Sequence, residues 1–170
     1  HHGEVSEAFA DAVGSFRQIV AIEPDPFSRA RLLDNLKGRL GTRGGVVVHN
    51  CAVSDDEGEA LFHDGLDYAS QLSATGRMRV VRRRLDALNL DPTVIKLHLE
   101  GAELPALKGA RDTLLRRRPI VLATVYHNDD GVWRTAQWLM ETLPDYRMLF
   151  RAHSWCGTGA VIYAIPNERA

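Results

Sequence analysis

The segment VIKLHLEGAELPALKGA at residues 94–110 contains, in order, a short apolar run, a glycine turn and a helical pattern. The run at residues 94–99 is typical of a buried parallel strand. Residues 103–115 have apolar side chains at helical spacing, at Leu104, Leu107, Ala110 and Leu114. A strand followed at once by a helix is the repeating unit of a parallel sheet, so this segment predicts an α/β protein.

The same alternation continues on both sides of this segment. Further apolar runs predict strands, and apolar residues at every third or fourth position predict helices. The expected strands are residues 18–22, 46–48 and 119–125, and the expected helices are residues 4–13, 25–40 and 132–143. A meander is expected within residues 60–81. Residues 147–150 and 160–165 predict a final antiparallel hairpin, because the loop between them has no room for a helix.

Composition points to a globular protein with a small-molecule partner. The chain has 170 residues, of which 45% are hydrophobic and 25% charged, as expected for one domain. Its formal net charge of -1 argues against nucleic acid, which usually requires a broad basic surplus. Cys51 and Cys156 are far apart, which favours a reducing cytoplasm over a disulfide framework or a zinc knuckle. No apolar run reaches the roughly 20 residues of a membrane span.

Two basic runs are the exceptions to this balance: Arg77, Arg79 and residues 82–84 form the first, and residues 116–118 the second. We interpret them as a solvated strand face and a helix C-terminus, where cations are favoured by the helix dipole. A phosphate-bearing substrate, such as a nucleotide-linked sugar, is the alternative.

An acid follows the strand expected at residues 18–22. In open α/β sheets ligands bind beyond the carboxyl ends of the strands, and an acid about 20 residues after a glycine turn holds the ribose of a nucleotide. Gly3 and Glu23 have that spacing. The ribose hydroxyls are suitable donors to a carboxylate at a strand end. The alternative is that Glu23 is simply a loop acid.

Charged and imidazole side chains gather at the carboxyl ends of the later strands. Lys96, His98 and Glu100 alternate along residues 94–99 and are expected on one face, unless Lys96 forms a structural ion pair with Glu100 or Glu103. His98, His127 and His153 follow three successive expected strands and could converge on one pocket. They contain no local ligand pair, so substrate binding or proton transfer is expected there and no metal.

Several short motifs resemble the FkbM family of S-adenosylmethionine-dependent methyltransferases. The most specific is Lys-x-x-x-Glu-Gly-Ala-Glu at residues 96–103, followed by Leu-Lys-Gly-Ala at residues 107–110. The others are Ile22-Glu23-Pro24-Asp25-Pro26, Asn35-Leu36, Ala52-Val53-Ser54-Asp55 with Gly58, and Leu85-Asp86. The C-terminal half is similar to one branch of the family, at Pro119, Tyr126-His127, Tyr146, Arg151, His153 and Tyr163-Ala164.

The resemblance implies a class I methyltransferase, a Rossmann-like α/β fold with a doubly wound, mostly parallel sheet and a C-terminal antiparallel hairpin. It implies a single domain over residues 1–170, S-adenosyl-L-methionine as cofactor, and O-methylation of a hydroxyl on a sugar, glycan or secondary metabolite. His1-His2-Gly3 matches the end of the glycine turn that follows the family's first strand. We therefore expect the native chain to continue upstream of His1 with that strand, which would be missing here.

The resemblance also implies roles for individual residues. Cofactor contacts are expected from Gly3 to the methionine part, from Glu23 to the ribose and from Cys51 and Ala52 beside the adenine, with Pro24 and Val53 adjoining them. Cys51 stands where many methyltransferases have an acid for the adenine amino group. The expected catalytic residues are His98, Lys96 and Glu100, and the expected acceptor-binding residues are Glu103, Tyr126, His127 and His153.

His98 departs from the family pattern Lys-x-Asp-x-Glu-Gly, in which an aspartate occupies its position. Imidazole is a competent base near neutral pH, so His98 is expected to accept the proton of the acceptor hydroxyl. The departure leaves open a methyltransferase-fold domain that no longer catalyses and serves for binding or scaffolding. A nicotinamide-dependent oxidoreductase is a third possibility that Gly3 and Glu23 alone would allow, but the expected hairpin and the Glu-Gly-Ala-Glu element disfavour it.

Overall fold

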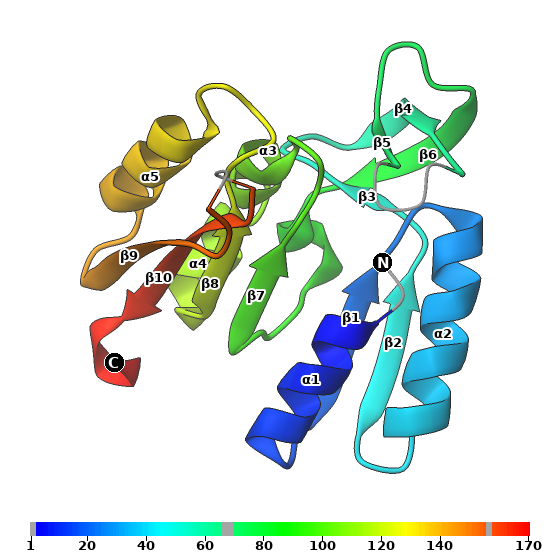
Figure 1. Ribbon diagram of the computed structural model, residues 1–170, viewed down its shortest axis with the longest axis horizontal. Helices are drawn as coiled ribbons and strands as arrows, with labels where there is room; N and C mark the ends of the chain where they lie inside the picture. The colour runs from blue at the N-terminus through cyan, green and yellow to red at the C-terminus, as the bar shows by residue number, and fades with distance from the viewer. Residues whose placement is uncertain (1–2, 66–69, 156–157) are drawn as a thin grey trace. The chain divides into compact units, whose positions relative to one another are not determined.

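The computed structural model describes residues 3–65, 70–155 and 158–170 (Figure 1). The chain forms two units, the first made of His1–Ala52 and Gly58–Arg82 and the second of Val53–Glu57 and Arg83–Ala170. We call these unit 1 and unit 2 and describe each by itself. The prediction of a single domain stays a prediction. No helix in the described ranges is long and apolar enough to cross a membrane.

The first part of unit 1 is a parallel strand pair with two helices. Its elements are α1 (Glu4–Val13), β1 (Gln18–Ile22), α2 (Pro26–Leu40) and β2 (Gly45–His49), all within one residue of the predicted bounds. β1 and β2 are parallel and in register, from Gln18 opposite Gly45 to Ile22 opposite His49. Figure 1 shows the two helices in blue beside these strands. The core consists of Ala10, Leu32, Leu36 and Leu40, with Phe16, Ile19, Ala21, Val46 and Val48 packed against it.

The start of α2 is stabilised by a buried carboxylate. Asp25 Oδ1 accepts hydrogen bonds from the backbone N–H groups of Phe27 at 3.0 Å and Ser28 at 2.8 Å, and proline follows as the first helical residue. Asp25 Oδ2 accepts from the Gly65 N–H at 2.9 Å and the Ser70 hydroxyl at 3.3 Å. Burial raises the pKa of this carboxyl, but the hydrogen bonds outweigh it, so the pKa lies below its usual value. The ionised side chain thus ties the helix start to Gly65 and Ser70.

The second part of unit 1 is the predicted meander. Its strands are β4 (Gly58–His63), β5 (Gln71–Leu72) and β6 (Met78–Arg83), and with β3 (Ala52–Val53) they form a sheet in the order β3-β6-β4-β5. β4 and β6 are antiparallel, from Gly58 opposite Arg82 to Phe62 opposite Met78. One face of the sheet buries Ala52, Phe62 and Val80. Arg79 of this sheet pairs with Glu59, and both side chains are exposed, as expected for a solvated strand face.

Unit 2 contains a mixed four-stranded sheet in the order β7-β8-β10-β9. β7 (Val94–Leu97) and β8 (Ile120–Thr124) are parallel, and Val94 lies opposite Ile120 and Leu97 opposite Ala123. β10 (Ala160–Pro166) is antiparallel to β8 and to β9 (Tyr146–Ala152). Helix α5 (Gly131–Thr142) contacts β9 and β10. Two short 3-10 turns, η2 (Leu85–Leu88) and η3 (Asn167–Arg169), complete the unit.

The described strands pair in three small sheets, and the doubly wound sheet that the sequence predicts stays a prediction. Within the described residues, the parallel pairs β1–β2 and β7–β8 belong to separate sheets, and the larger sheets are antiparallel or mixed. Among the described strands, β1 pairs only with β2 and β7 only with β8. The fold is therefore a mixed α/β fold with several small sheets.

The helix predicted at residues 103–115 is broken into α3 (Glu103–Lys108) and α4 (Arg111–Arg117). The break follows from a backbone contact at Gly109, where an added Cβ would lie 1.9 Å from the carbonyl oxygen of Ser54. Only glycine allows so close an approach, and glycine also weakens a helix. The apolar spacing continues across the break because Leu107, Ala110 and Leu114 are all buried. Periodicity alone therefore did not reveal it.

We expect Gly109→Ala to lower the free energy of unfolding by about 1 to 3 kcal/mol, because the added methyl group overpacks a backbone contact. Gly38→Ala is the matched control. Gly38 lies inside α2, and a Cβ there meets nothing within 4 Å, so alanine should stabilise the helix by about 1 kcal/mol. Urea unfolding of both variants checks the pair, and a Gly109→Ala protein as stable as the wild type would contradict the contact with Ser54.

Asp25→Ala should lower the free energy of unfolding at neutral pH by about 1 to 3 kcal/mol, since a helix cap is lost and buried donors lose their acceptor. Because the pKa of Asp25 is lowered by folding, its contribution is present above the ordinary carboxyl pKa and is lost as the pH falls through the lowered value. The difference between wild type and variant should therefore shrink in acid. Asp34→Ala, on the exposed side of α2, should change stability by less than about 0.5 kcal/mol at either pH.

Candidate functional site

Two parallel strands of unit 2 bring polar side chains to one edge of the sheet. β7 ends at Leu97 and β8 at Thr124, and the strands are in register, so the residues after them meet. The ring centroids of His98 and His127 are 5.0 Å apart, and those of Tyr126 and His127 are 4.2 Å apart. The convergence of His98 and His127 that the sequence suggested is present in the structure.

Glu100 lies between the two imidazoles. Its Oε1 is 3.2 Å from His98 Nε2 and 3.3 Å from His127 Nε2. The chain turns sharply after β7, because Glu100 has a φ of 51° and Gly101 a φ of 103°. An added Cβ on Gly101 would lie 2.8 Å from Asn128 Oδ1, and the Asn128 amide donates to the Gly101 carbonyl at 2.8 Å. Glycine at this position therefore allows the turn that places the carboxylate.

Glu103 holds both the turn and His127. Its carboxylate accepts hydrogen bonds from the Leu99 N–H at 2.8 Å, the Gly101 N–H at 3.0 Å and the Thr124 hydroxyl at 2.7 Å. Its Oε1 also lies 2.7 Å from His127 Nδ1. Burial raises the pKa of the Glu103 carboxyl, but these hydrogen bonds outweigh it and keep the pKa below its usual value. An ionised carboxylate can only accept, so Nδ1 of His127 carries a proton.

Glu103 is almost fully enclosed by groups of its own unit. The residue is only 4% exposed, and both carboxylate oxygens are engaged by groups of the same unit. In the structure Glu103 positions the turn and His127, and its expected contact with an acceptor stays a prediction. Thr124 and Asn128, which the sequence did not single out, share this role, because the first binds Glu103 and the second binds the turn. Thr124 ends an apolar strand, where no sequence pattern distinguishes it.

The electrostatics of the cluster favour a neutral imidazole at His98. Burial lowers the pKa of His98, and the charges of Lys96 and His127 lower it further, against the opposing effect of Glu100 and Glu103. The Tyr126 hydroxyl lies 3.4 Å from His98 Nε2, and burial raises the pKa of this phenol. His98 is thus able to accept a proton, while Tyr126 keeps its own.

Lys96 and His153 form no hydrogen bond or ion pair with the described residues of this cluster. Lys96 is on the exposed side of β7, between the buried Ile95 and Leu97, and no described carboxylate lies within ion-pair distance of it. The structural ion pair considered for Lys96 is therefore not formed with Glu100 or Glu103. His153 Nε2 lies 2.7 Å from the Tyr163 hydroxyl. Of the three histidines that follow strands, two come together and the third pairs with a tyrosine.

The residues expected to hold a cofactor belong to unit 1, except for Val53. Gly3 precedes α1 with a φ of 99°, and a Cβ there would lie 3.0 Å from Leu36 Cδ2. Glu23 follows β1, and its Oε1 accepts from the Asp25 N–H at 2.9 Å, which orients the carboxylate. Pro24 is half-buried, and Cys51, Ala52 and Val53 are buried and apolar. A glycine with positive φ at a helix start and an oriented acid after a strand fit the needs of a nucleotide cofactor.

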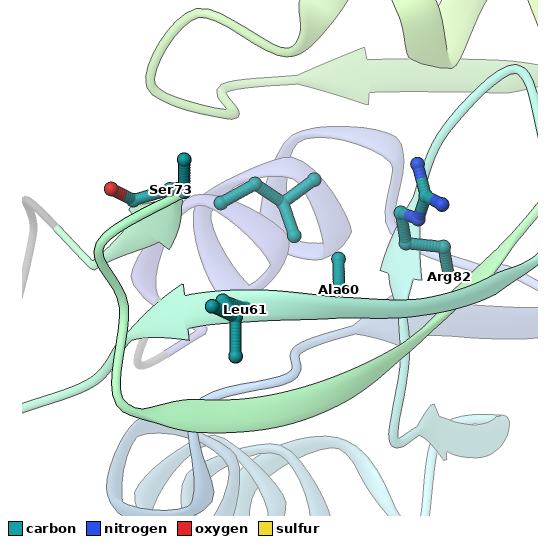
Figure 2. A pocket seen from close by; sticks show the side chains of 6 residues that line it. Ala60, Leu61, Ser73 and Arg82 are labelled. Carbon is teal, nitrogen blue, oxygen red and sulfur yellow. The ribbon is translucent and has the colours of Figure 1, made fainter.

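A pocket of about 350 Å³ in unit 1 lies elsewhere on the meander (Figure 2). It is lined by Ala60, Leu61, Leu72, Ser73, Ala74 and Arg82. None of the predicted site residues lines it. Its only ionisable side chain is Arg82, so it offers no acid or base for catalysis.

In α/β proteins, a glycine turn, an acid after a strand and polar groups at the carboxyl edge of a sheet are features of sites that bind small molecules. The profile of the Methyltransferase FkbM domain matches residues 1–154, and the chain therefore belongs to the FkbM methyltransferase family. The expected family membership is confirmed.

A solved structure of this family has the same fold. The crystal structure of methyltransferase FkbM from Methylobacillus flagellatus KT matches with a TM-score of 0.74 over 96% of this chain, at 23% sequence identity. This chain spans 41% of that protein's length. Comparison with curated proteins finds no match.

Glu103→Gln should lower the free energy of unfolding at neutral pH by about 1 to 3 kcal/mol. The amide keeps the shape of the side chain, but its NH₂ group would face donors that now bind a carboxylate. Glu141→Gln is the control, because Glu141 is exposed on α5 and bonds only the Gln137 amide in the described structure. Urea unfolding checks both variants. Equal stability of Glu103→Gln and wild type would show that the carboxylate does not hold the turn.

Proposed function

We propose that this chain is an S-adenosyl-L-methionine-dependent O-methyltransferase that methylates a hydroxyl of a sugar, glycan or secondary metabolite. The observation that carries the proposal is the cluster of His98, Glu100, Tyr126 and His127 in unit 2, of which His98 and Glu100 lie in the Lys-x-x-x-Glu-Gly-Ala-Glu segment at residues 96–103. We further propose the doubly wound class I arrangement for the complete fold. The parallel pairs β1–β2 and β7–β8 and the antiparallel pair β9–β10 support it.

The cofactor supplies an electrophilic methyl group on a sulfonium sulfur. Glu23 is proposed to accept hydrogen bonds from its ribose hydroxyls, since the carboxylate follows β1 and is oriented by the Asp25 N–H. Gly3 is proposed to lie beside the methionine part, because glycine adopts the positive φ of the turn before α1 without strain. Pro24, Cys51, Ala52 and Val53 are proposed to flank the adenine with largely apolar surface.

His98 is proposed as the proton acceptor for the hydroxyl that receives the methyl group. Its side chain is 39% exposed, so an acceptor can reach it, and its lowered pKa favours the neutral ring. The proton of the hydroxyl would move to His98 and then to solvent. Glu100, 3.2 Å from Nε2, would stabilise the imidazolium formed in between.

The remaining predicted residues are proposed to bind the acceptor. The Tyr126 hydroxyl keeps its proton and can donate to an acceptor oxygen. Lys96, on the exposed side of β7, is a second donor. His127 and His153 offer further polar contacts. A hydroxyl-rich small molecule matches this set of donors. We also propose a cytoplasmic location and no nucleic-acid partner, on the cysteine content and the net charge of -1.

The cofactor half of the proposal is tested by calorimetry with S-adenosylhomocysteine. Glu23→Ala should weaken binding at least tenfold, because a charge-assisted hydrogen bond contributes about 1.5 to 3 kcal/mol. The matched control is Asp34→Ala, which removes an exposed carboxylate of the same unit and should leave the affinity unchanged. Wild-type protein that binds NAD but not S-adenosylhomocysteine would overturn the proposal.

The chemical half is tested by methyl transfer from labelled S-adenosylmethionine to a panel of sugars and polyols. His98→Ala should lower kcat by about 10²- to 10⁴-fold and leave the affinity for S-adenosylhomocysteine unchanged. His98→Asp, which restores the residue of the family pattern, should keep more activity than His98→Ala. Equal turnover of wild type and His98→Ala would remove His98 from the mechanism. Cofactor binding without turnover of any acceptor would favour a binding domain.

A further inference from the structure

Three possible metal ligands of unit 2 converge at the end of β7. His98, Glu100 and His127 each offer one ligand atom, and these atoms all lie within 4.8 Å of one another. Glu100 Oε1 is 3.2 Å from His98 Nε2 and 3.3 Å from His127 Nε2. Neighbouring ligand atoms around a zinc ion at ordinary bond lengths are about 3.0 to 3.4 Å apart. The two carboxylate–imidazole distances already match that spacing.

The buried nitrogen of His127 lacks a hydrogen bond within this cluster. The side chain is 8% exposed, and among the described residues its Nε2 has no hydrogen-bond partner, although Glu100 lies close by. A buried polar atom without a partner is unfavourable and is rare in folded proteins. A cation bound between Glu100 and the two imidazoles would satisfy it.

Glu103 gives His127 the surroundings of a metal ligand. Nδ1 lies 2.7 Å from Glu103 Oε1, and the carboxylate can only accept, so Nδ1 carries the proton. In the neutral ring the lone pair is then on Nε2, the atom next to Glu100. Metal-binding histidines almost always donate their second ring N–H to a carboxylate or a carbonyl.

We propose that His98, Glu100 and His127 bind one divalent transition-metal ion of the zinc type, with Glu103 as the outer carboxylate that orients His127. Two imidazoles and one carboxylate suit zinc and its neighbours, whereas magnesium and calcium prefer oxygen ligands. An ion at about 2.1 Å from both nitrogens needs them no more than about 4.2 Å apart. The two nitrogens lie within 4.8 Å of each other, so any adjustment needed is small, and the half-exposed His98 can make it.

This site differs from the sequence expectation that the histidines hold no metal. The ligands are separated along the chain, and only the parallel register of β7 and β8 brings His127 to the turn that carries Glu100. Three protein ligands leave a position for water or a hydroxyl, whose pKa a bound zinc ion lowers. In the metal-bound form His98 Nε2 is a ligand, and a hydroxyl at the open position would lose its proton to solvent instead. Metal binding itself does not depend on the proposed methyl transfer.

The test is a titration of metal-free protein with Zn²⁺ by calorimetry, and with Co²⁺ by visible absorption. His1 and His2, which lie outside the described residues, are replaced by alanine in every protein used, so that they offer no competing site. We expect one Zn²⁺ per chain, a rise in Tm on binding, and a Co²⁺ spectrum with the d–d bands of nitrogen and oxygen ligands. Absence of stoichiometric binding would overturn the proposal.

Variants locate the ion. His98→Ala and His127→Ala should each weaken Zn²⁺ binding by more than about 100-fold, and Glu103→Gln by about 10- to 100-fold. His98 is half-exposed, so its variant should fold even if His127→Ala does not. His153→Ala is the matched control, because His153 is also hydrogen-bonded in unit 2 but pairs with Tyr163, and it should bind Zn²⁺ as the parent does. Binding that persists in His98→Ala would place the ion elsewhere and overturn the proposal. Since metal binding is measured without cofactor or acceptor, its failure is distinct from a failure of methyl transfer.

Discussion

The carboxylate of Glu103 is the interaction on which the candidate site of unit 2 depends. It binds the N–H groups of Leu99 and Gly101 in the turn after β7, the Thr124 hydroxyl at the end of β8, and Nδ1 of His127. A buried charge is unfavourable unless it is hydrogen-bonded, and this one is bonded on both oxygens. The same carboxylate therefore determines the path of the turn, the closeness of the two strand ends and the proton position on His127. His98 and Glu100 obtain their geometry from that turn.

The proposed base and the proposed metal site are two uses of one group of atoms. The His98 ring is available to an acceptor proton when no ion is bound, and it is a ligand when an ion is bound. Both uses need an unprotonated ring, which burial and the charge of Lys96 favour by lowering the pKa of His98. An aspartate, which the resemblance to the family implies at this position, would supply an oxygen in place of this nitrogen. Replacement by histidine moves the ligand set from oxygen towards nitrogen and thus towards zinc-like ions.

In unit 1 a single residue, Asp25, likewise holds several groups between β1 and α2. Asp25 caps the helix and binds Gly65 and Ser70, while its own N–H orients the carboxylate of Glu23. The position proposed for ribose binding is thus controlled by the same short segment that starts the helix. Loss of the Asp25 cap would be expected to disturb Glu23 as well as α2, which links the stability of this unit to the proposed cofactor contacts.

The sequence by itself determined the local elements, because hydrophobic periodicity, the Asp25-Pro26 cap and the glycine positions act over a few residues. It also determined the family, through the motif at residues 96–103. It did not reveal the break at Gly109, because that break comes from a contact with Ser54, distant in the chain. Nor did it separate the roles of Glu100 and Glu103 or of His127 and His153. Those roles depend on strand register, on burial and on the direction of single side chains. Only the tertiary structure decides these features, because they arise from contacts between segments that are distant in the chain and share no local sequence pattern.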